Sequence, residues 1–460
     1  MMESHAFENK NIAVFGLGKS GMATAERLTT GKAHVFVWDD NQGRRDLALS
    51  KGLVIKDLIS DSWTATDALI LSPGVPLTHP APHPVVGMAL KAGAKIVGDI
   101  EVFLKEKKAG KIIGVTGTNG KSTTSALIDH LLTSAGKSAA LGGNIGTPVM
   151  DLPQLPEEGA YVLELSSYQL DLTPSWKADI AILLNITPDH LDRHGDMAGY
   201  AAVKCRIFQH QSETGIAIVD ADDSICAAIT SELKRHSKAK IVPISVNHPV
   251  EAGVYVIDGL LSDQSLDDQS WTLDISDIAS LRGRHNWQNA AAAVAAASHL
   301  GLTPDEIENG LRTFGGLAHR MENVGSLDHV TFVNDSKATN AEAAEKALTS
   351  FNDIFWIAGG RQKAGGIEQL APHFDRVREA FLIGEASESF ANQLEGKVNY
   401  TICKDLEEAT KAAALAAKKL SSGAIVLLSP AAASFDQFDS FEARGDAFRN
   451  FVTDLLVGDK

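Results

Sequence analysis

A short glycine-rich loop in the first third of the chain carries the clearest chemical signal. Residues 117–123 read Gly-Thr-Asn-Gly-Lys-Ser-Thr, with an apolar run before them and a helical stretch after them. Backbone N–H groups of such a loop can surround phosphate oxygens, Lys121 can place a positive charge on the outer phosphates, and the hydroxyl of Ser122 or Thr123 can bind Mg²⁺. Val115 stands where a P-loop ordinarily has its first glycine. The pattern predicts a shortened P-loop, which does not by itself say what ATP or GTP is used for.

A second glycine-rich turn lies near the N-terminus. Gly16, Gly18 and Gly21 have the spacing Gly-x-Gly-x-x-Gly between an apolar run and a helical stretch, and Asp39 ends the next apolar run. Without side chains, such a turn lets a diphosphate approach the backbone, the helix N-terminus favours its charge, and the acid can accept a hydrogen bond from a ribose. The pattern predicts a site for a diphosphate nucleotide. A tight turn without a ligand is the alternative.

An acidic residue follows a later strand of the unit that carries the P-loop. Glu164 lies near the end of the apolar run 161–165. The carboxyl ends of parallel strands face the nucleotide crevice, and Mg²⁺ bound to phosphates needs one or two protein oxygens. We therefore predict that Ser122 and Glu164 share an Mg²⁺ ion.

Two histidines further along the chain admit a second kind of metal site. His190 and His194 are four residues apart, a spacing that also occurs in zinc sites. Pro188 and Gly195 favour a loop over a helix here, and no third soft ligand is near in the sequence. Zinc is therefore the less favoured interpretation.

Tyr200 and Lys204 would lie on one face of a helix, because they are four residues apart. The pair also matches the Tyr-x-x-x-Lys of short-chain dehydrogenases. With the N-terminal glycine turn it supports a nicotinamide oxidoreductase as an alternative, although this leaves the P-loop unexplained. A third hypothesis is a nucleotide-binding module without catalytic activity.

The composition restricts the class of protein. The 460 residues are 44% hydrophobic, and 42 basic against 58 acidic residues give a net charge of −16. An acidic chain argues against nucleic acid and anionic membranes as partners. Three scattered cysteines, no apolar signal segment and no apolar run of about 18 residues predict a soluble cytoplasmic protein.

Apolar runs alternate with helical stretches along the whole chain, which predicts an α/β protein with doubly wound, mostly parallel sheets. A small edge sheet is expected within 241–277. The expected strands are 12–15, 34–38, 68–71, 111–115, 161–165, 180–185, 330–333, 354–358, 380–383 and 424–428, and the expected helices are 22–30, 123–135, 286–300 and 341–349. We expect three domains, with boundaries 1–100, 101–316 and 317–460.

Taken together, the motifs resemble those of the Mur ligases of peptidoglycan synthesis. The resemblance runs in order through nearly the whole chain, at residues 117–123, 142–146, 164–167, 185–192, 200–206, 285–289, 319–322 and 334–340. It implies a Rossmann-like first domain that binds a UDP-linked substrate, a P-loop ATPase-like central domain, and a Rossmann-like third domain that binds an amino acid.

Within that family the chain is most similar to the members that add D-glutamate. The features are the N-terminal glycine turn, Asn119 in the P-loop and the run Ser-Pro-Ala-Ala-Ala-Ser-Phe-Asp-Gln-Phe at 429–438. The Asp-Asn-Pro-Arg motif of the diaminopimelate-adding members is absent. The resemblance implies that D-glutamate is joined to UDP-N-acetylmuramoyl-L-alanine through an acyl phosphate, with ATP converted to ADP and phosphate.

The resemblance also implies roles for individual residues. Lys121, Glu164, His190, Lys204 and Lys337 are expected to be catalytic. Two Mg²⁺ ions are expected on Ser122, Glu164, His190 and a CO₂-derived carbamate carried by Lys204. ATP is expected to contact Gly117, Thr118, Asn119, Gly120, Lys121, Ser122, Thr123, Asn144, Asn286, Asn289, Arg320 and Asp335.

The remaining expected contacts belong to the other two substrates. The UDP-linked substrate is expected at Gly18, Lys19, Ser20, Asp39, Ser72, Pro73 and Gly74. D-Glutamate is expected at Lys337, Thr339, Lys363, Ser434 and Phe441. Asp40-Asn41 departs from the family here, because Thr-Arg is expected at these two positions.

We expect a monomer whose partners are these small molecules, without nucleic acid or membrane. Arg320 and Asp335 belong to the third domain, whereas the P-loop belongs to the second. Since both are expected to meet ATP, we predict a hinge near Gly315-Gly316 that lets the protein open and close.

Overall fold

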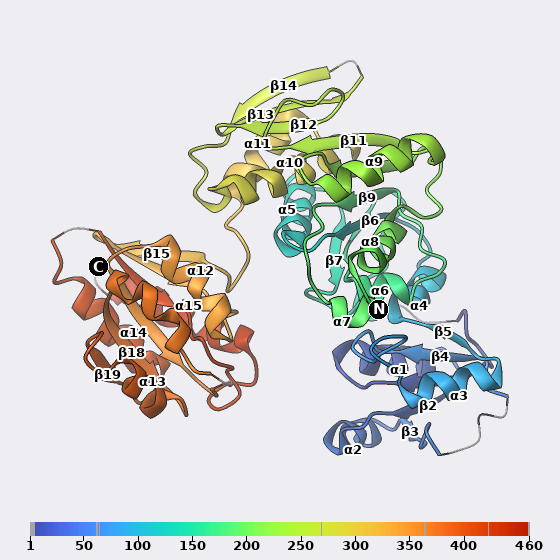
Figure 1. Ribbon diagram of the computed structural model, residues 1–460, viewed down its shortest axis with the longest axis horizontal. Helices are drawn as coiled ribbons and strands as arrows, with labels where there is room; N and C mark the ends of the chain where they lie inside the picture. The colour runs from blue at the N-terminus through green and yellow to red at the C-terminus, as the bar shows by residue number, and fades with distance from the viewer. Residues whose placement is uncertain are drawn as a thin grey trace. The chain divides into compact units, whose positions relative to one another are not determined.

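The computed structural model describes residues 5–60, 63, 65–267, 269–362, 365–421 and 423–458. The chain divides into two compact units, Met1–Phe314 and Gly315–Lys460. The first unit contains two sheets and the second contains one, each flanked by helices, which is the predicted α/β class (Figure 1). The unit boundary falls directly before the Gly315-Gly316 pair. Motion at that pair stays a prediction.

The first sheet is parallel and has the order β3-β2-β1-β4-β5. Its apolar strands are buried because helices cover both faces; all four residues of β4 are buried. β1 lies between β2 and β4, so the turn after β1 opens at the point where such sheets bind ligands. The elements are β1 (Asn11–Phe15), α1 (Lys19–Thr30), β2 (His34–Trp38), α2 (Gln42–Ser50), β3 (Val54–Ile55), β4 (Ala68–Leu71), α3 (Pro84–Ala92), β5 (Lys95–Val97) and α4 (Asp99–Glu106).

The second sheet has nine strands in the order β14-β13-β12-β11-β10-β9-β6-β8-β7. β6 lies between β8 and β9, so the carboxyl ends of these three strands meet at one edge. The strands are β6 (Lys111–Thr116), β7 (Ala139–Gly143), β8 (Ala160–Glu164), β9 (Ile180–Leu183), β10 (Ile216–Asp220), β11 (Lys240–Ser245), β12 (Val254–Ile257), β13 (Leu260–Leu266) and β14 (Gln269–Asp274). The strands expected within 241–277 therefore exist, and they extend this sheet at its edge, with β13 and β14 antiparallel.

Helices pack on both sides of the second sheet. They are α5 (Lys121–Ser134), α6 (Ser167–Asp171), α7 (Leu191–His194), α8 (Met197–Cys205), α9 (Ser224–His236), α10 (Arg284–His299) and α11 (Pro304–Thr313). α10 packs against α5, and its residues 290–297, seven alanines and one valine, are fully buried. Small side chains let these two helices approach closely, which brings the first turns of α10 beside the P-loop.

The second unit has one sheet in the order β15-β16-β20-β17-β18-β19, parallel except for β15. Its elements are β15 (Glu322–Leu327), β16 (Val330–Asn334), α12 (Ala341–Ser350), β17 (Ile354–Gly359), β18 (Val377–Ile383), α13 (Ser387–Leu394), β19 (Tyr400–Ile402), α14 (Leu406–Ala417), β20 (Ala424–Leu428) and α15 (Phe441–Gly458). β20 lies between β16 and β17, so the loops after these three strands share one edge of the sheet.

Most predicted elements agree with the structure to within a few residues, and the differences have local causes. α1 and α5 begin earlier than predicted, at Lys19 and Lys121, because the glycines Gly18 and Gly120 are themselves the N-cap residues. The strand predicted at 180–185 ends at Leu183, where the chain turns toward the P-loop. No helix among the described residues is long and apolar enough to cross a membrane.

Candidate functional site

The P-loop connects β6 to α5 and is held by side chains on both sides. The Lys121 Nζ donates hydrogen bonds to the carbonyls of Gly117 at 2.9 Å and Thr118 at 2.8 Å. Asn185, after β9, accepts from the Asn119 N–H at 2.8 Å and donates to the Asn119 carbonyl at 3.2 Å. These hydrogen bonds hold the loop, and Asn185, the first residue of the matched run 185–192, is a contributor to which the sequence assigned no role.

Gly120 must be a glycine because of its backbone angle and its neighbour. Its φ is +86°, and a Cβ there would collide with the Asn289 Oδ1. Asn289 is 2% exposed, accepts from the Thr124 hydroxyl at 3.2 Å and donates to the Asn286 Oδ1 at 3.3 Å. The structure therefore brings Asn286 and Asn289 beside the P-loop, as predicted, while their contact with ATP stays a prediction.

Lys204 lies under the P-loop on α8. Its side chain is 2% exposed, and its Nζ donates to the Gly117 carbonyl at 2.8 Å, the same carbonyl that accepts from Lys121. Burial and the positive charge of Lys121 lower the pKa of Lys204 to about 7, against the opposing effect of Asp189. Near neutral pH a large fraction of this amine is therefore uncharged.

Tyr200 shares the buried face of α8 with Lys204, which confirms the predicted arrangement. The Tyr200 hydroxyl lies 3.2 Å from the Thr118 hydroxyl, and its ring centroid lies 4.6 Å from the Lys204 Nζ. Both side chains thus contact the P-loop, whereas the N-terminal glycine turn belongs to another sheet. The pair therefore lies beside the P-loop and not beside the glycine turn on which the oxidoreductase alternative depends.

Glu164 ends β8 beside the P-loop and carries an unsatisfied oxygen. Its side chain is 2% exposed and its Oε1 accepts from the Asn144 Nδ2 at 2.8 Å. The Oε2 is buried and has no hydrogen-bond partner within the part of the chain that the structure describes. A buried carboxylate oxygen of this kind requires a counter-charge, so a divalent cation fits here. Ser122 and Thr123 lie in the first turn of α5, and their sharing a cation with Glu164 stays a prediction.

The predicted loop between Pro188 and Gly195 is wrong in part, because Leu191–His194 form the one-turn helix α7. His190 is its N-cap, with φ +51°, and its Nε2 lies 3.4 Å from the Asp189 Oδ2. A single helical turn therefore stands where a loop was expected. The His190 side chain before it is 50% exposed.

The two histidines pack against an aromatic ring. The Tyr168 ring contacts both, at 5.1 Å from His190 and 5.5 Å from His194. The His194 Nε2 is 2.9 Å from the Ser167 hydroxyl. No group of three or more His, Cys, Asp or Glu side chains suited to a metal occurs among the described residues. Mg²⁺ remains compatible, because it takes few protein ligands and completes its shell with phosphate and water.

The N-terminal glycine turn has one open position. A Cβ at Gly16 would meet Ser72, and one at Gly21 would meet the Gly16 carbonyl, whereas one at Gly18 would meet nothing within 4 Å. Gly18 is therefore where a ligand can approach the backbone. The exposed Lys19 and the half-buried Ser20 open α1 directly after it.

Asp39 is buried beneath this turn and organises it. Its carboxylate accepts from the N–H groups of Leu17 at 2.6 Å and Asn41 at 2.8 Å and from the Arg44 guanidinium at 3.2 Å. Burial alone would raise the pKa of Asp39, but these hydrogen bonds lower it below its ordinary value. The carboxylate is therefore charged and already engaged by the protein, and its predicted contact with a ribose remains untested.

At Asp40-Asn41 the sequence differs from the family, and two arginines follow in the first turn of α2. The Asn41 side chain caps α2 by accepting from the Arg44 N–H at 3.2 Å. The Arg45 guanidinium lies 4.4 Å from the Trp38 ring centroid. Cations are thus present at this end of the first sheet, although not at the position where the family resemblance places an arginine.

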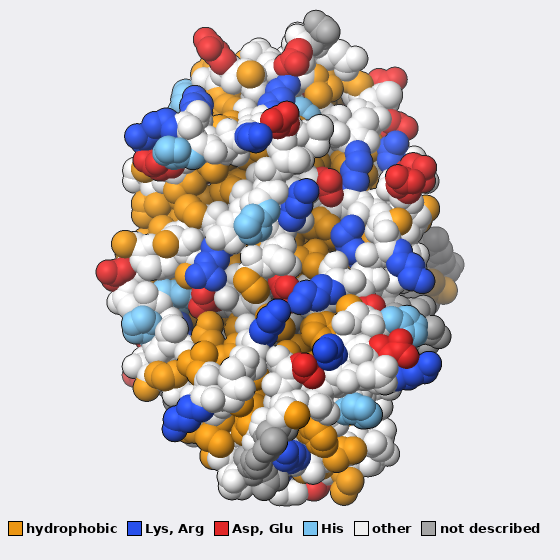
Figure 2. Space-filling model, turned by 90° about the vertical axis from the view of Figure 1, so that its right-hand side faces the viewer, with side chains coloured by type: hydrophobic (Ala, Val, Ile, Leu, Met, Phe, Trp, Pro, Cys, Tyr) orange, Lys and Arg blue, Asp and Glu red, His pale blue; other side chains and the backbone are white. Residues whose placement is uncertain are grey.

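The surface is not uniformly acidic despite the net charge of −16. Figure 2 shows one face of the molecule, on which Lys and Arg side chains are interspersed with Asp and Glu side chains. Local cations and backbone N–H groups can therefore hold anionic small molecules on this chain.

In the second unit, Asp335 follows β16 and is buried. Its Oδ2 accepts from the Ser429 hydroxyl at 2.8 Å and its Oδ1 from the Met321 N–H at 3.3 Å. Burial raises the pKa of Asp335 to about 7, although these hydrogen bonds and the charge of Arg320 act against the rise. Arg320 itself is exposed.

The structure brings together part of the predicted D-glutamate site. The Lys337 Nζ lies 5.9 Å from the Phe441 ring centroid, and the Thr339 N–H donates to the Lys337 carbonyl at 2.8 Å. Ser434 is 2% exposed on the loop after β20. Lys363 lies outside the described residues.

Arg444, which the sequence did not single out, connects these two loops. It is 1% exposed and donates to the Ser336 hydroxyl at 3.0 Å, to the Ser336 carbonyl at 2.9 Å and to the Ala432 carbonyl at 3.1 Å. Burial lowers its pKa to about 10. Ser336 is 108 residues away in the sequence, so no local pattern could have identified this contact.

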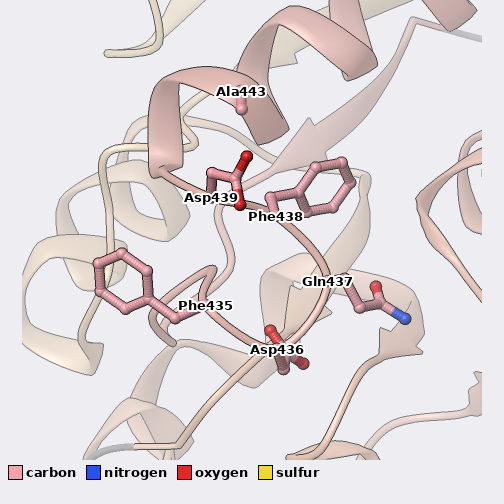
Figure 3. A pocket seen from close by; sticks show the side chains of 6 residues that line it. All are labelled: Phe435, Asp436, Gln437, Phe438, Asp439 and Ala443. Atoms are coloured by element: carbon pink, nitrogen blue, oxygen red, sulfur yellow. The ribbon is translucent and has the colours of Figure 1, made fainter. Parts of the chain in front are cut away.

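An open hollow of ≈390 Å³ lies along the loop after Ser434 (Figure 3). Phe435 is 63% exposed, and its side chain and that of Gln437 project to different sides of the loop. The hollow is lined by Phe435, Asp436, Gln437, Phe438, Asp439 and Ala443.

Comparison with protein families and curated proteins decides the family. Three family models match: "Mur ligase MurD-like, N-terminal domain" over residues 10–98, "Mur ligase middle domain" over 115–297, and "Mur ligase, glutamate ligase domain" over 319–432. A protein of Caulobacter sp. (strain K31), named UDP-N-acetylmuramoylalanine–D-glutamate ligase, is 50% identical over 461 residues, covering 99% of this chain and 98% of the relative. The chain belongs to the Mur ligase family.

Other relatives of this Mur ligase carry the same name. The proteins of Phenylobacterium zucineum and Rhizobium meliloti are each 48% identical, over 100% and 99% of this chain. Among solved structures, UDP-N-acetylmuramate-alanine ligase MurC from Thermotoga maritima has a TM-score of 0.55 at 18% identity, covering 98% of this chain and 99% of that chain. At that identity the structural likeness shows that the Mur ligase fold is shared.

Proposed function

We propose that the protein is an ATP-dependent amide ligase that adds D-glutamate to UDP-N-acetylmuramoyl-L-alanine in peptidoglycan synthesis. The observation that carries the proposal is 50% identity, over 98% of its length, to a protein named UDP-N-acetylmuramoylalanine–D-glutamate ligase. The geometry supports the chemistry, because two lysines share the Gly117 carbonyl at the edge of the sheet where the buried Glu164 ends β8.

The chemistry requires an activated carboxylate. A carboxylate and an amine do not condense at neutral pH, so the carboxylate of the UDP-linked substrate first attacks the γ-phosphate of ATP to give an acyl phosphate and ADP. The D-glutamate amine then attacks the acyl carbon, and phosphate leaves with one of the former carboxylate oxygens. The first step depends on positioning and charge neutralisation rather than on covalent chemistry of the protein.

The P-loop supplies that positioning. Lys121 and the N–H groups of residues 117–123 hold the phosphates, and α10 contributes Asn286 and Asn289 beside them. Ser122, Glu164, His190 and Lys204 would hold two Mg²⁺ ions, which would neutralise phosphate charge. Asn144 orients the Glu164 carboxylate.

Lys204 fits a role as a carbamate carrier. Only an uncharged amine adds CO₂, with loss of a proton, and the pKa of Lys204 at about 7 makes that form available near neutral pH. The carbamate converts a cationic side chain into oxygen ligands of the kind that Mg²⁺ prefers.

The remaining substrate contacts are proposed from the family resemblance. Gly18, Lys19, Ser20, Asp39 and Ser72 to Gly74 would bind the UDP-linked substrate, Arg320 and Asp335 would bind ATP, and Lys337, Thr339, Lys363, Ser434 and Phe441 would bind D-glutamate. We further propose the domain boundaries 1–100, 101–316 and 317–460, and a protein that works as a monomer in the cytoplasm.

A substrate panel tests the proposal. Phosphate release by the purified full-length protein is measured with ATP, Mg²⁺ and UDP-N-acetylmuramoyl-L-alanine, adding D-glutamate, L-glutamate, L-alanine or diaminopimelate in turn. We expect rapid release with D-glutamate and a product heavier by one glutamyl residue in mass spectrometry. Equal release without any amino acid, or a preference for another amino acid, would contradict the proposal.

A further inference from the structure

Arg193 connects the first sheet of the first unit to the second through three backbone carbonyls. It lies on α7, and its guanidinium donates to the carbonyls of Gly74 at 3.0 Å, Val75 at 3.1 Å and Pro73 at 3.4 Å. Gly74 is 119 residues away in the sequence. These acceptors belong to the turn after β4, where the Val75 N–H also donates to the Ser72 carbonyl at 2.9 Å. One side chain therefore fixes the position of a turn in the other sheet.

The same guanidinium also lies over an aromatic ring. The Arg193 Cζ lies 4.5 Å from the centroid of Tyr168, and the Tyr168 ring contacts both His190 at 5.1 Å and His194 at 5.5 Å. The space between the turn, Tyr168 and α7 is only ≈10 Å³, about enough for one water molecule. Arg193, Tyr168 and both histidines are therefore in contact with one another or with the turn, with little space left between them.

The contacts continue to the P-loop. His194 lies 5.4 Å from the Tyr200 ring, and the Tyr200 hydroxyl lies 3.2 Å from the Thr118 hydroxyl. A continuous series of packed side chains thus runs from the turn after β4, through Arg193 and Tyr168, to the phosphate site. A planar guanidinium suits this place, because its several N–H donors reach separate carbonyls while its flat face stacks on a ring.

We propose that Arg193 is a positioning residue that sets the turn Ser72–Val75 at a fixed distance from His190 and the P-loop, so that the carboxylate of the UDP-linked substrate is delivered to the γ-phosphate. This inference rests on the proposed function, because it assigns the turn to that substrate. Arg193 itself does not transfer a proton or a phosphate. Its effect is on the alignment of two groups held by different sheets.

Kinetics of the full-length protein test this role with three variants. Arg193→Met removes the donors and keeps the length of the side chain, Arg193→Lys keeps one charge without the planar fork, and Arg235→Met, on an exposed arginine of α9, is the matched control. We expect Arg193→Met to lower kcat/KM for the UDP-linked substrate about 100-fold. The kcat should fall because a misalignment near 1 Å slows the transfer, and KM should rise because a loosened turn binds this substrate less well. The KM values for ATP and D-glutamate should stay near wild type, Arg193→Lys should be intermediate, and Arg235→Met should be unchanged.

Hydrogen exchange in the absence of substrates provides a readout that is independent of activity. Arg193→Met should speed the exchange of amides in residues 72–78 and leave those of 117–123 unchanged. Unchanged exchange at 72–78, or an unchanged KM for the UDP-linked substrate, would overturn the inference. A uniform change of all three KM values together with a lower melting temperature would also overturn it, because it would show a general structural role.

The two readouts separate this inference from the proposed function. If the wild-type protein released no phosphate with D-glutamate, the proposed function would fail. The exchange comparison would still decide whether Arg193 holds the turn.

Discussion

The two glycine loops of the first unit have the same backbone construction but different side chains around them. Each follows the strand at which the strand order of its sheet reverses, β1 in one and β6 in the other. Each opens a helix whose N-cap is a glycine, Gly18 in one and Gly120 in the other. At Gly18 a Cβ would meet open space, whereas at Gly120 it would meet Asn289. At the P-loop, moreover, both Lys121 of the loop and Lys204 of α8 donate to the carbonyl of Gly117.

The comparison teaches that the glycine pattern specifies a phosphate-sized turn, whereas the surrounding side chains specify what happens to the phosphate. The N-terminal turn offers backbone N–H groups and space, which suits binding without reaction. The P-loop contributes Lys121, Lys204 of α8 lies beneath it, and a carboxylate with an unsatisfied oxygen borders it, which suits phosphate transfer. Variants in equivalent positions of the two loops should therefore have unequal effects.

The largest contrast is expected between the two loop lysines. Lys121→Ala should lower kcat about 10³-fold, the scale on which losing a cation at a transferring phosphoryl group acts. Binding of the UDP-linked substrate, measured by calorimetry, should be nearly unchanged. Lys19→Ala, in the N-terminal turn, should instead raise the KM for that substrate and leave kcat intact. If Lys121→Ala lost both turnover and binding of the UDP-linked substrate, the P-loop would be a structural element.

Lys204→Ala should lower kcat about 10²-fold to 10³-fold, since it removes a ligand group beside the phosphates. A short-chain carboxylic acid such as acetate should partly restore the rate, because it can supply the missing oxygens. Lys238→Ala, at an exposed lysine, is the control and should behave as wild type. If the acid fails to raise the rate of Lys204→Ala at any concentration, the carbamate proposal is wrong.

The pH dependence should follow the same lysine. The amine adds CO₂ only when uncharged, and the pKa of Lys204 lies at about 7, so kcat should rise with pH up to about 7 and fall about tenfold per unit below it. Asp335 also has a pKa of about 7, but it is present in every variant. Since the acid-rescued Lys204→Ala protein lacks the Lys204 amine, its kcat should not fall below pH 7. A persistent fall below pH 7 in that variant would assign it to Asp335 instead.

The smallest contrast concerns stability. Gly120→Ala should lower the free energy of unfolding by about 1–3 kcal/mol, because the residue has φ +86° and its Cβ would meet Asn289. Gly18→Ala has φ −68° and open space, so it should change that free energy by less than about 0.5 kcal/mol while raising the KM for the UDP-linked substrate. Urea unfolding of both variants measures the difference. Equal destabilisation would show that the two loops are packed alike.

The sequence allowed the loops, most strands and the shared face of Tyr200 and Lys204 to be predicted, because these depend on local periodicity and on glycine at fixed spacing. It assigned no role to Asn185, Arg193 or Arg444. Each of these side chains acts on backbone groups that are remote in the sequence, at separations of 66, 119 and 108 residues. Such contacts arise only when the strand order brings the ends of distant strands together. The helix α7 was missed for a related reason, since a single turn has too few residues to show a period.

Isotope transfer tests the central claim most directly, namely that the P-loop activates a carboxylate by phosphorylation. UDP-N-acetylmuramoyl-L-alanine labelled with ¹⁸O in both carboxylate oxygens is converted with ATP, Mg²⁺ and D-glutamate, and the released phosphate is analysed by mass spectrometry. We expect one ¹⁸O atom in each phosphate and one in the new amide. Unlabelled phosphate formed together with the ligated product would contradict the account.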